Sequence, residues 1–179
     1  MKNLPLLLLF LTLSAFCTEV AINGNFEELD AKGLPVRWMK NSWSGYKPEC
    51  TLEVVKGGGL KGNSLRMTNI QAKRGAAFNT SFYPGICGDS VRLSFRARGK
   101  GRITVWTGNY VDYTTGKPGY RIVDGTSENH TFELGEEWKV YTFEVAKLGL
   151  ATERVAQRIR MAEGSQADVD DFYVPPMFE

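Results

Sequence analysis

Side chains suited to metal or nucleophilic chemistry are scarce in this sequence. The 179 residues include one histidine and three cysteines. The histidine, His130, lies in a polar segment with no nucleophile pattern beside it, so a surface role is favoured over catalysis. The glycine run at 57–59 lacks the lysine and the helix of a phosphate-binding loop, and no Cys/His spacing suits zinc. The sequence therefore predicts a protein that is not an enzyme.

Charge of one sign is also lacking. Lysines and arginines number 22 and aspartates and glutamates number 20, which gives a formal net charge of +2. Acids and bases are interspersed along the chain, so no overall field favours nucleic acid or a membrane surface. Neither is expected as a partner.

The long apolar run of this chain lies at its amino terminus. Lys2 is followed by a run from Leu4 to Leu13 that Pro5 and Thr12 interrupt, and then by small residues. This pattern predicts a secretory signal peptide at 1–17, too short to span a bilayer as a mature helix. We expect a single domain at 18–179, secreted or periplasmic, without membrane insertion. A lipid on Cys17 is the alternative, although the bulky Phe16 disfavours it.

Two cysteines, Cys50 and Cys87, remain once a signal peptide has left. An exported chain meets an oxidising compartment, which tends to join such a pair. The sequence therefore predicts a Cys50–Cys87 disulfide, with two separate buried thiols as the alternative.

A sustained helical period is absent, and short segments of alternating polarity, separated by Gly, Asn, Asp and Pro, recur instead. This pattern predicts an all-β fold, a two-sheet antiparallel β-sandwich of the jelly-roll type. Loops are predicted at 56–59 and 109–119, and a helical turn at 148–155. The predicted strands are 35–39, 51–55, 64–69, 76–82, 90–98, 102–107, 120–123, 130–134, 137–145, 157–162 and 167–174.

The clearest strand is Ser90–Arg98, where apolar residues alternate with Arg92, Ser94, Arg96 and Arg98. The turn Gly99-Lys100-Gly101 follows, and Arg102–Thr107 alternates in the same way. We expect the two strands to form a hairpin within one sheet.

Acidic residues occur at both ends of the predicted domain, in Asn23–Glu27 and in Asp168–Phe172. First and last strands of a sandwich often lie near each other, so Glu27 and Asp170 are candidates to meet at a hard cation. The alternative is that both are solvated acids at strand ends.

Six short patterns follow one another along the domain: Asn23-Gly24-Asn25-Phe26-Glu27, Gly33-Leu34-Pro35-Val36-Arg37-Trp38, Gly62-Asn63-Ser64-Leu65-Arg66-Met67, Leu93-Ser94-Phe95-Arg96-Ala97-Arg98, Trp138 with Tyr141-Thr142-Phe143, and Val169-Asp170-Asp171-Phe172. In this order and spacing the chain resembles the carbohydrate-binding modules of families four, nine, sixteen and twenty-two, which are galactose-binding-like jelly rolls. The resemblance covers almost the whole domain.

The resemblance implies a structural Ca²⁺ that ties the first strand to the last. It would place the ion on Glu27 and Asp170, with main-chain oxygen near Asn25. A third acid is often found where this chain has Lys61, so a backbone carbonyl of Leu60 or Lys61 would have to replace it.

Exposed aromatics beside polar side chains are typical of a glycan-binding surface. By alternation Trp106 shares a side with the arginines of its predicted hairpin partner, Arg92 and Arg96. Trp43, Tyr46, Tyr110 and Tyr113 are rim candidates, whereas Trp38 and Trp138 are expected in the core. The alternative is that Trp106 only covers the sheet and that the arginines form a solvated face.

These observations lead to a secreted, noncatalytic module that binds a polysaccharide or oligosaccharide on a β-sheet face, beside a separate carbohydrate-active enzyme. Arginine forks next to Trp106 would suit a carboxylated or sulfated sugar, and Arg158 and Arg160 would add charge if their strand lies nearby. The alternatives are a small jelly-roll hydrolase or lyase using Asp112 with Asp124 or Glu128, and an envelope-associated adhesive protein.

Overall fold

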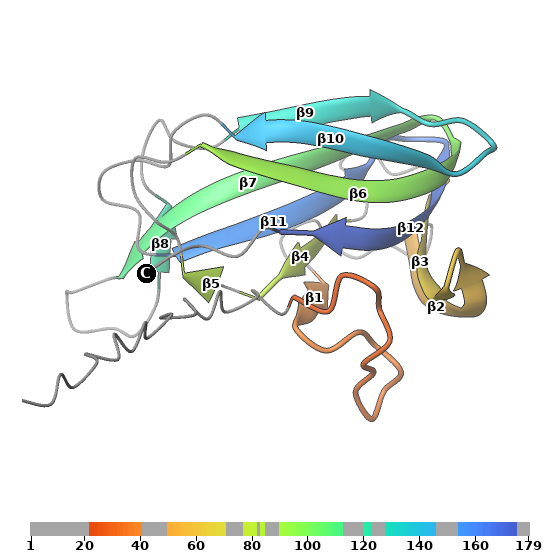
Figure 1. The fold of residues 1–179 in the computed structure, drawn as a ribbon, viewed down its shortest axis with the longest axis horizontal. Helices are drawn as coiled ribbons and strands as arrows, with labels where there is room; N and C mark the ends of the chain where they lie inside the picture. Colours follow the sequence, from red (N-terminus) through yellow and green to blue (C-terminus); the bar gives the residue numbers. More distant parts are fainter. Residues whose placement is uncertain are drawn as a thin grey trace, which may run out of the picture.

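A computed structural model describes residues 22–40, 50–70, 77–81, 83–84, 90–112, 120–122, 128–145 and 154–174. They form two antiparallel sheets packed face to face as a jelly-roll β-sandwich, which confirms the predicted fold class (Figure 1). Within this part of the chain, no helix is long and apolar enough to cross a membrane.

The first sheet has seven strands, in the order β1-β4-β11-β7-β8, with β5 beside β11 and β9 beside β7. The central strands β7 (Arg102–Asp112) and β11 (Arg154–Met161) pair along their length, with Trp106 opposite Arg158. The remaining strands are β1 (Trp38–Lys40), β4 (Ala77–Thr80), β5 (Tyr83–Pro84), β8 (Tyr120–Ile122) and β9 (Glu128–Glu133).

The second sheet has five strands, in the order β10-β6-β12-β3-β2. The last strand of the fold, β12 (Ser165–Tyr173), lies at its centre, between β6 (Val91–Lys100) and β3 (Gly62–Asn69). The edges are β2 (Cys50–Gly59) and β10 (Lys139–Val145). In Figure 1 β12, drawn in blue, lies beside the gold β3 although about 100 residues separate them in sequence.

The alternating apolar residues of both sheets meet in one core, as binary patterning requires. Phe26, Phe78 and Phe95 have no exposed surface, and Trp38 stacks on Phe78 with 5.3 Å between ring centroids. Phe172 of β12 packs against both Trp38 and Phe95. The prediction that Trp38 belongs to the core is confirmed.

Every predicted strand overlaps an observed one, but the hairpin of 90–98 with 102–107 is wrong. β6 lies in the five-stranded sheet and β7 in the seven-stranded sheet. Gly99 and Gly101, with φ of +144° and +80°, carry the chain from one sheet to the other. Two glycines around one residue therefore form a corner of the sandwich here, not a two-stranded ribbon.

Other corrections concern predicted loops. Residues 56–59 continue β2, with a register shift between Val55 and Gly59, and β7 continues through 109–112. Arg154 and Val155 belong to β11, so the predicted helical turn does not extend that far. The signal peptide at 1–17 and Cys87 lie outside the described residues, and the disulfide stays a prediction.

The two ends of the domain meet, as the sequence predicted. Phe172 N donates a hydrogen bond of 2.9 Å to Gly24 O, which joins the first described segment to the central strand β12. The Trp38 indole donates to Asn23 O at 3.2 Å, and its ring packs edge-on against Phe172. This clasp, formed by Asn23, Gly24, Trp38 and Phe172, closes one end of the sandwich.

Gly24 is the position where the clasp can be tested. A Cβ on Gly24 would collide with the backbone carbonyl of Phe172. We expect Gly24→Ala to lower the free energy of unfolding by about 1–3 kcal/mol, the usual cost of overpacking. Chemical denaturation followed by tryptophan fluorescence measures the change. Gly135→Ala is the control, because the nearest atom to its Cβ would lie 3.6 Å away; equal losses in both variants would contradict the clasp.

Candidate functional site

The outer face of the seven-stranded sheet has a tryptophan braced by an arginine. Trp106 of β7 is half-buried, and the Arg158 guanidinium lies over its ring, 4.5 Å from the centroid. Arg158 Nε donates a hydrogen bond of 3.0 Å to Asn79 Oδ1 on β4. The guanidinium is therefore fixed from two sides, by an aromatic face and by an amide.

Trp106 also lies over the backbone of its own strand. Its ring covers Gly108, where any Cβ would collide with the indole. Tyr110, two residues further on the same face, meets the indole edge-on at 6.3 Å between centroids. Glycine at 108 thus lets the indole lie down along the sheet, so that Trp106 and Tyr110 form one aromatic strip, in which Tyr110 is buried beside the indole at 9% exposure.

Polar side chains surround this strip. Thr104 of β7 and Thr131 of β9 share a hydrogen bond of 2.9 Å between their hydroxyls, and the exposed Asn129 is paired with Trp106 across the strands. We call the whole set the Trp106 surface: Asn79, Thr104, Trp106, Tyr110, Asn129, Thr131, Arg158 and Arg160.

The Trp106 surface is basic. Arg154, Arg158 and Arg160 alternate along β11 on its outer side. Glu133 of β9 is the acidic residue among the described side chains of this face, and it is paired with Arg102 at 3.8 Å. Burial lowers the pKa of Arg158, and the neighbouring Arg160 lowers it further, while Tyr110 opposes the shift. An anion placed here would meet arginines that no described carboxylate neutralises.

The structure divides the binding residues that the sequence predicted between two faces. Arg92 and Arg96 lie on the outer face of the five-stranded sheet, opposite the Trp106 surface, because β6 and β7 are in different sheets. Arg92 lies 3.9 Å from Glu144, and Arg96 lies 3.2 Å from Asp171. Tyr110 joins Trp106, whereas Trp43, Tyr46 and Tyr113 lie outside the described residues.

Trp138 is not in the core, so that prediction is wrong. The residue is half-buried on the loop between β9 and β10, where the Arg98 guanidinium lies 5.0 Å from its ring centroid. Its apolar surface is covered by an arginine stem and guanidinium instead of by the opposite sheet.

Glu27 and Asp170 converge on the turn between β2 and β3. Glu27 Oε1 accepts a hydrogen bond of 2.6 Å from Asn63 N, and Asp170 Oδ2 accepts one of 3.0 Å from Leu60 N. Gly59 and Gly62 allow this approach, since a Cβ at either would meet one of the two carboxylates. Lys61 lies in the same turn and is exposed.

These residues can offer a cation two carboxylates, each of which also accepts a hydrogen bond from a main-chain N–H of the turn. Asp170 is 2% exposed and forms no ion pair with any described lysine or arginine. Its burial raises its pKa, although hydrogen bonds from Asp171 N and Leu60 N oppose the shift. No cluster of three acidic, histidine or cysteine side chains occurs in the described ranges. The donor set therefore fits a weak Ca²⁺ site completed by carbonyls and water.

Of the three acids of the hydrolase alternative, Asp112, Asp124 and Glu128, the structure describes the side chain of Glu128, which lies beside His130. His130 points between the sheets, with its ring 4.7 Å from that of Phe143, and its Nε2 lies 3.3 Å from Glu128 Oε2. Asp124 lies outside the described residues, as does the side chain of Asp112. Glu128 is held by the histidine on the inner side of β9, away from the Trp106 surface.

Sequence reasoning gave Asn79 no part in ligand binding and placed Arg158 at the site only conditionally. Both residues alternate outward along predicted strands, which was a usable signal. The missing information was that β11 pairs with both β4 and β7, which brings Asn79, Arg158 and Trp106 into one row.

Solved structures share this fold. No protein-family model matches the chain, and no curated protein does. A family 4 carbohydrate-binding module is 18% identical over 87% of this chain and 98% of its own, with a TM-score of 0.53. A family 61 module in complex with β-1,4-galactotriose is 16% identical over 89% of this chain and 99% of its own, with a TM-score of 0.51.

A similar fold also occurs within larger chains and in further modules. The enzymatically active domain of tailspike protein 4 from bacteriophage CBA120 has a TM-score of 0.61 at 12% identity, over 87% of this chain but 22% of its own. Modules of families 22 and 11 from Clostridium thermocellum also match. The fold is that of jelly-roll carbohydrate-binding modules. This confirms the fold that the resemblance in sequence implied.

The buried carboxylate makes stability depend on pH. Burial raises the pKa of Asp170 from its ordinary value of 3.8, so the folded chain binds the proton of this acid more tightly than the unfolded chain does. In the presence of chelator, wild type should therefore lose stability relative to Asp170→Asn as the pH rises from about 4 toward neutrality. Denaturation midpoints at several pH values measure this difference. A difference that is constant with pH would contradict it.

Proposed function

We propose that this protein is a noncatalytic carbohydrate-binding module and that the Trp106 surface holds the glycan. The observation that carries the proposal is the half-buried Trp106 with Arg158 over its ring on an outer sheet face, backed by Tyr110, which is 9% exposed. Flat aromatic faces pack against sugar C–H groups, while amides, hydroxyls and guanidinium groups bind sugar hydroxyls. The shared fold with carbohydrate-binding modules supports this assignment.

The ligand class we infer is an acidic glycan. The Arg158 guanidinium lies over the Trp106 ring, and its Nε donates to Asn79 Oδ1. Its two terminal nitrogens therefore stay available to a carboxylate or sulfate. Arg160 lies two residues along the same strand and is exposed. The sequence predicted that Arg92 and Arg96 of β6 would bind the acidic group. We propose Arg158 and Arg160 of β11 for this role instead.

The cellular setting follows from the same proposal. Solved neighbours include a module bound to β-1,4-galactotriose and a xylanase fragment complexed with xylohexaose. The chain spans 28% of that xylanase fragment, whose remainder includes a catalytic module. We expect this protein to be secreted through the signal peptide at 1–17 and to act beside a separate carbohydrate-active enzyme.

We also propose that Ca²⁺ binds between the first described segment and β12. Glu27 and Asp170 would supply carboxylate oxygens, and main-chain carbonyls near Asn25 and in the 59–63 turn would supply the rest. The ion would neutralise the buried Asp170 and strengthen the clasp. Its role there is structural.

Removing the aromatic strip tests the binding surface. We expect Trp106→Ala to weaken binding of oligogalacturonate or a sulfated oligosaccharide by about tenfold or more, because stacking and the support of Arg158 are both lost. Arg158→Gln should weaken the acidic probes by a similar factor but change neutral ones little. Isothermal titration calorimetry at two salt concentrations measures both.

The control is Trp138→Ala, which removes a tryptophan of the same half-buried class from the opposite side of the molecule. Equal affinities in wild type and Trp106→Ala would overturn the proposed surface. Release of reducing ends from the polysaccharide by wild type would instead favour the hydrolase.

Chelation tests the cation site. Because an ion that binds only the folded state stabilises it by mass action, 100-fold excess over the dissociation constant should add about 2.7 kcal/mol to the free energy of unfolding. Thermal unfolding with Ca²⁺ or with chelator measures this gain, and Glu27→Gln should abolish it. Glu28→Gln is the matched control. A gain that persists in Glu27→Gln would place the ion elsewhere.

A further inference from the structure

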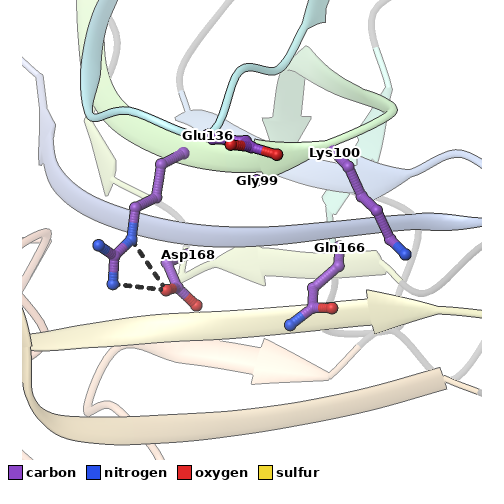
Figure 2. A pocket seen from close by; sticks show the side chains of 6 residues that line it. Gly99, Lys100, Glu136, Gln166 and Asp168 are labelled. Carbon is purple, nitrogen blue, oxygen red and sulfur yellow. Dashed lines mark hydrogen bonds and ion pairs between the residues drawn. The ribbon is translucent and has the colours of Figure 1, made fainter.

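A pocket opens on the other side of the sandwich, on the outer face of the five-stranded sheet. It has a volume of about 340 Å³ and is lined by Arg98, Gly99, Lys100, Glu136, Gln166 and Asp168 (Figure 2). The lining comes from the end of β6, the start of β12 and the loop between β9 and β10. A cavity of this size is large enough for one or two sugar rings.

One wall of the pocket is a buried carboxylate in a rigid network. Asp168 has 8% of its side chain exposed, and it accepts hydrogen bonds from Arg66 Nε at 2.7 Å and Arg66 Nη2 at 3.0 Å. Arg98 Nε donates to the same carboxylate at 3.2 Å. The hydrogen bond with Asp168 raises the pKa of Arg66. Since Asp168 is paired twice, it fixes Arg98 at the rim.

The loop above the pocket is also fixed. Gly99 N donates to Gly135 O at 2.7 Å, and Leu134 N donates to Gly101 O at 2.9 Å. These two bonds join the loop that carries Glu136 to the corner that carries Lys100. Arg98, which Asp168 holds, lies over the Trp138 ring in the same loop. The pocket is therefore preformed, which lowers the entropic cost of binding.

Three polar side chains face this space without a partner among the described residues: Lys100, Glu136 and Gln166. Figure 2 shows Glu136 and Lys100 on one side of the opening and Gln166 and Asp168 on the other. They present an ammonium donor, a carboxylate acceptor, and an amide that can do both. Sugar hydroxyls donate and accept hydrogen bonds at once, so they match such a mixed set.

The charges of the lining cancel. Arg98 and Lys100 are positive, and Glu136 and Asp168 are negative. In contrast to the Trp106 surface, the four charged side chains of this lining leave no net charge to attract an acidic sugar.

We propose that this pocket is a second saccharide site, on the opposite side of the sandwich, and that it binds a neutral sugar unit. The inference is independent of the Trp106 surface, because no residue is shared. With both sites occupied, one molecule would join a neutral glycan to an acidic one.

The test uses ¹⁵N-labelled protein titrated with xylohexaose, cellohexaose and β-1,4-galactotriose. In Trp106→Ala, where the first surface is removed, at least one of these neutral probes should still bind and shift the amide signals of residues 98–100, 136 and 166. The double variant Glu136→Ala/Gln166→Ala should weaken this binding by about tenfold or more, because two hydrogen-bonding groups are lost. Glu137→Ala, in the same loop but outside the pocket, should bind as wild type does.

The outcomes separate the two sites. Shifts confined to the Trp106 surface, or unchanged affinity in the double variant, would overturn the pocket and leave the proposed function intact. Binding that persists in Trp106→Ala and disappears in the double variant would establish the pocket, whatever the acidic probes do. If none of the neutral probes binds, the pocket proposal is wrong. Mixing wild type with a neutral and an acidic polysaccharide, each of which carries many binding units, should also give a precipitate, and the double variant should give none.

Discussion

The hydrogen bond between Phe172 and Gly24 is the constraint on which both ends of this sandwich depend. β12 is the last strand in sequence but lies at the centre of its sheet, so its position fixes the neighbours on either side. The clasp holds it from the other end of the chain, through Gly24 and through the Trp38 ring on Phe172. Immediately beside it, Phe26 and Asp171 adopt positive φ angles of 56° and 46°. Such conformations persist only where surrounding contacts hold them, and the cation that we propose at Glu27 and Asp170 would add to those contacts.

That central strand also separates two unlike surfaces. Its outward side chains Gln166 and Asp168 form part of a charge-balanced pocket, whereas the other sheet carries aromatic and basic groups. On the five-stranded face every described arginine lies within 4 Å of an acid: Arg66 and Arg98 of Asp168, Arg92 of Glu144, and Arg96 of Asp171. On the Trp106 surface Arg158 has an amide and an indole instead. The difference in pairing, not the number of arginines, makes one face attractive to anions.

Alternation along the chain was sufficient to locate nearly all strands, because a two-sheet core requires apolar residues at every second position. It was not sufficient to assign strands to sheets. The corner at Gly99 and Gly101 has the composition of a hairpin turn, and only the pairing of β6 with β12 and of β7 with β11 distinguishes the two. Because of that one error, the sequence placed the arginines of β6 beside Trp106, where the structure has those of β11. Trp138 was misplaced for a related reason, since an arginine can cover an indole as well as a core does.

The support given to Arg158 bears on whether Trp106 merely covers its sheet. If Trp106 only shielded the backbone, it would need no ordered side chain on its outer face. A long arginine side chain on a protein surface ordinarily keeps its rotamer freedom. Here the guanidinium is fixed by Trp106 at 4.5 Å and by Asn79 at 3.0 Å, and burial lowers its pKa. The cost of ordering and partly desolvating the group is therefore met before any ligand arrives. An anionic sugar would gain the full benefit of that preorganisation, because the guanidinium is already ordered and partly desolvated when the sugar binds.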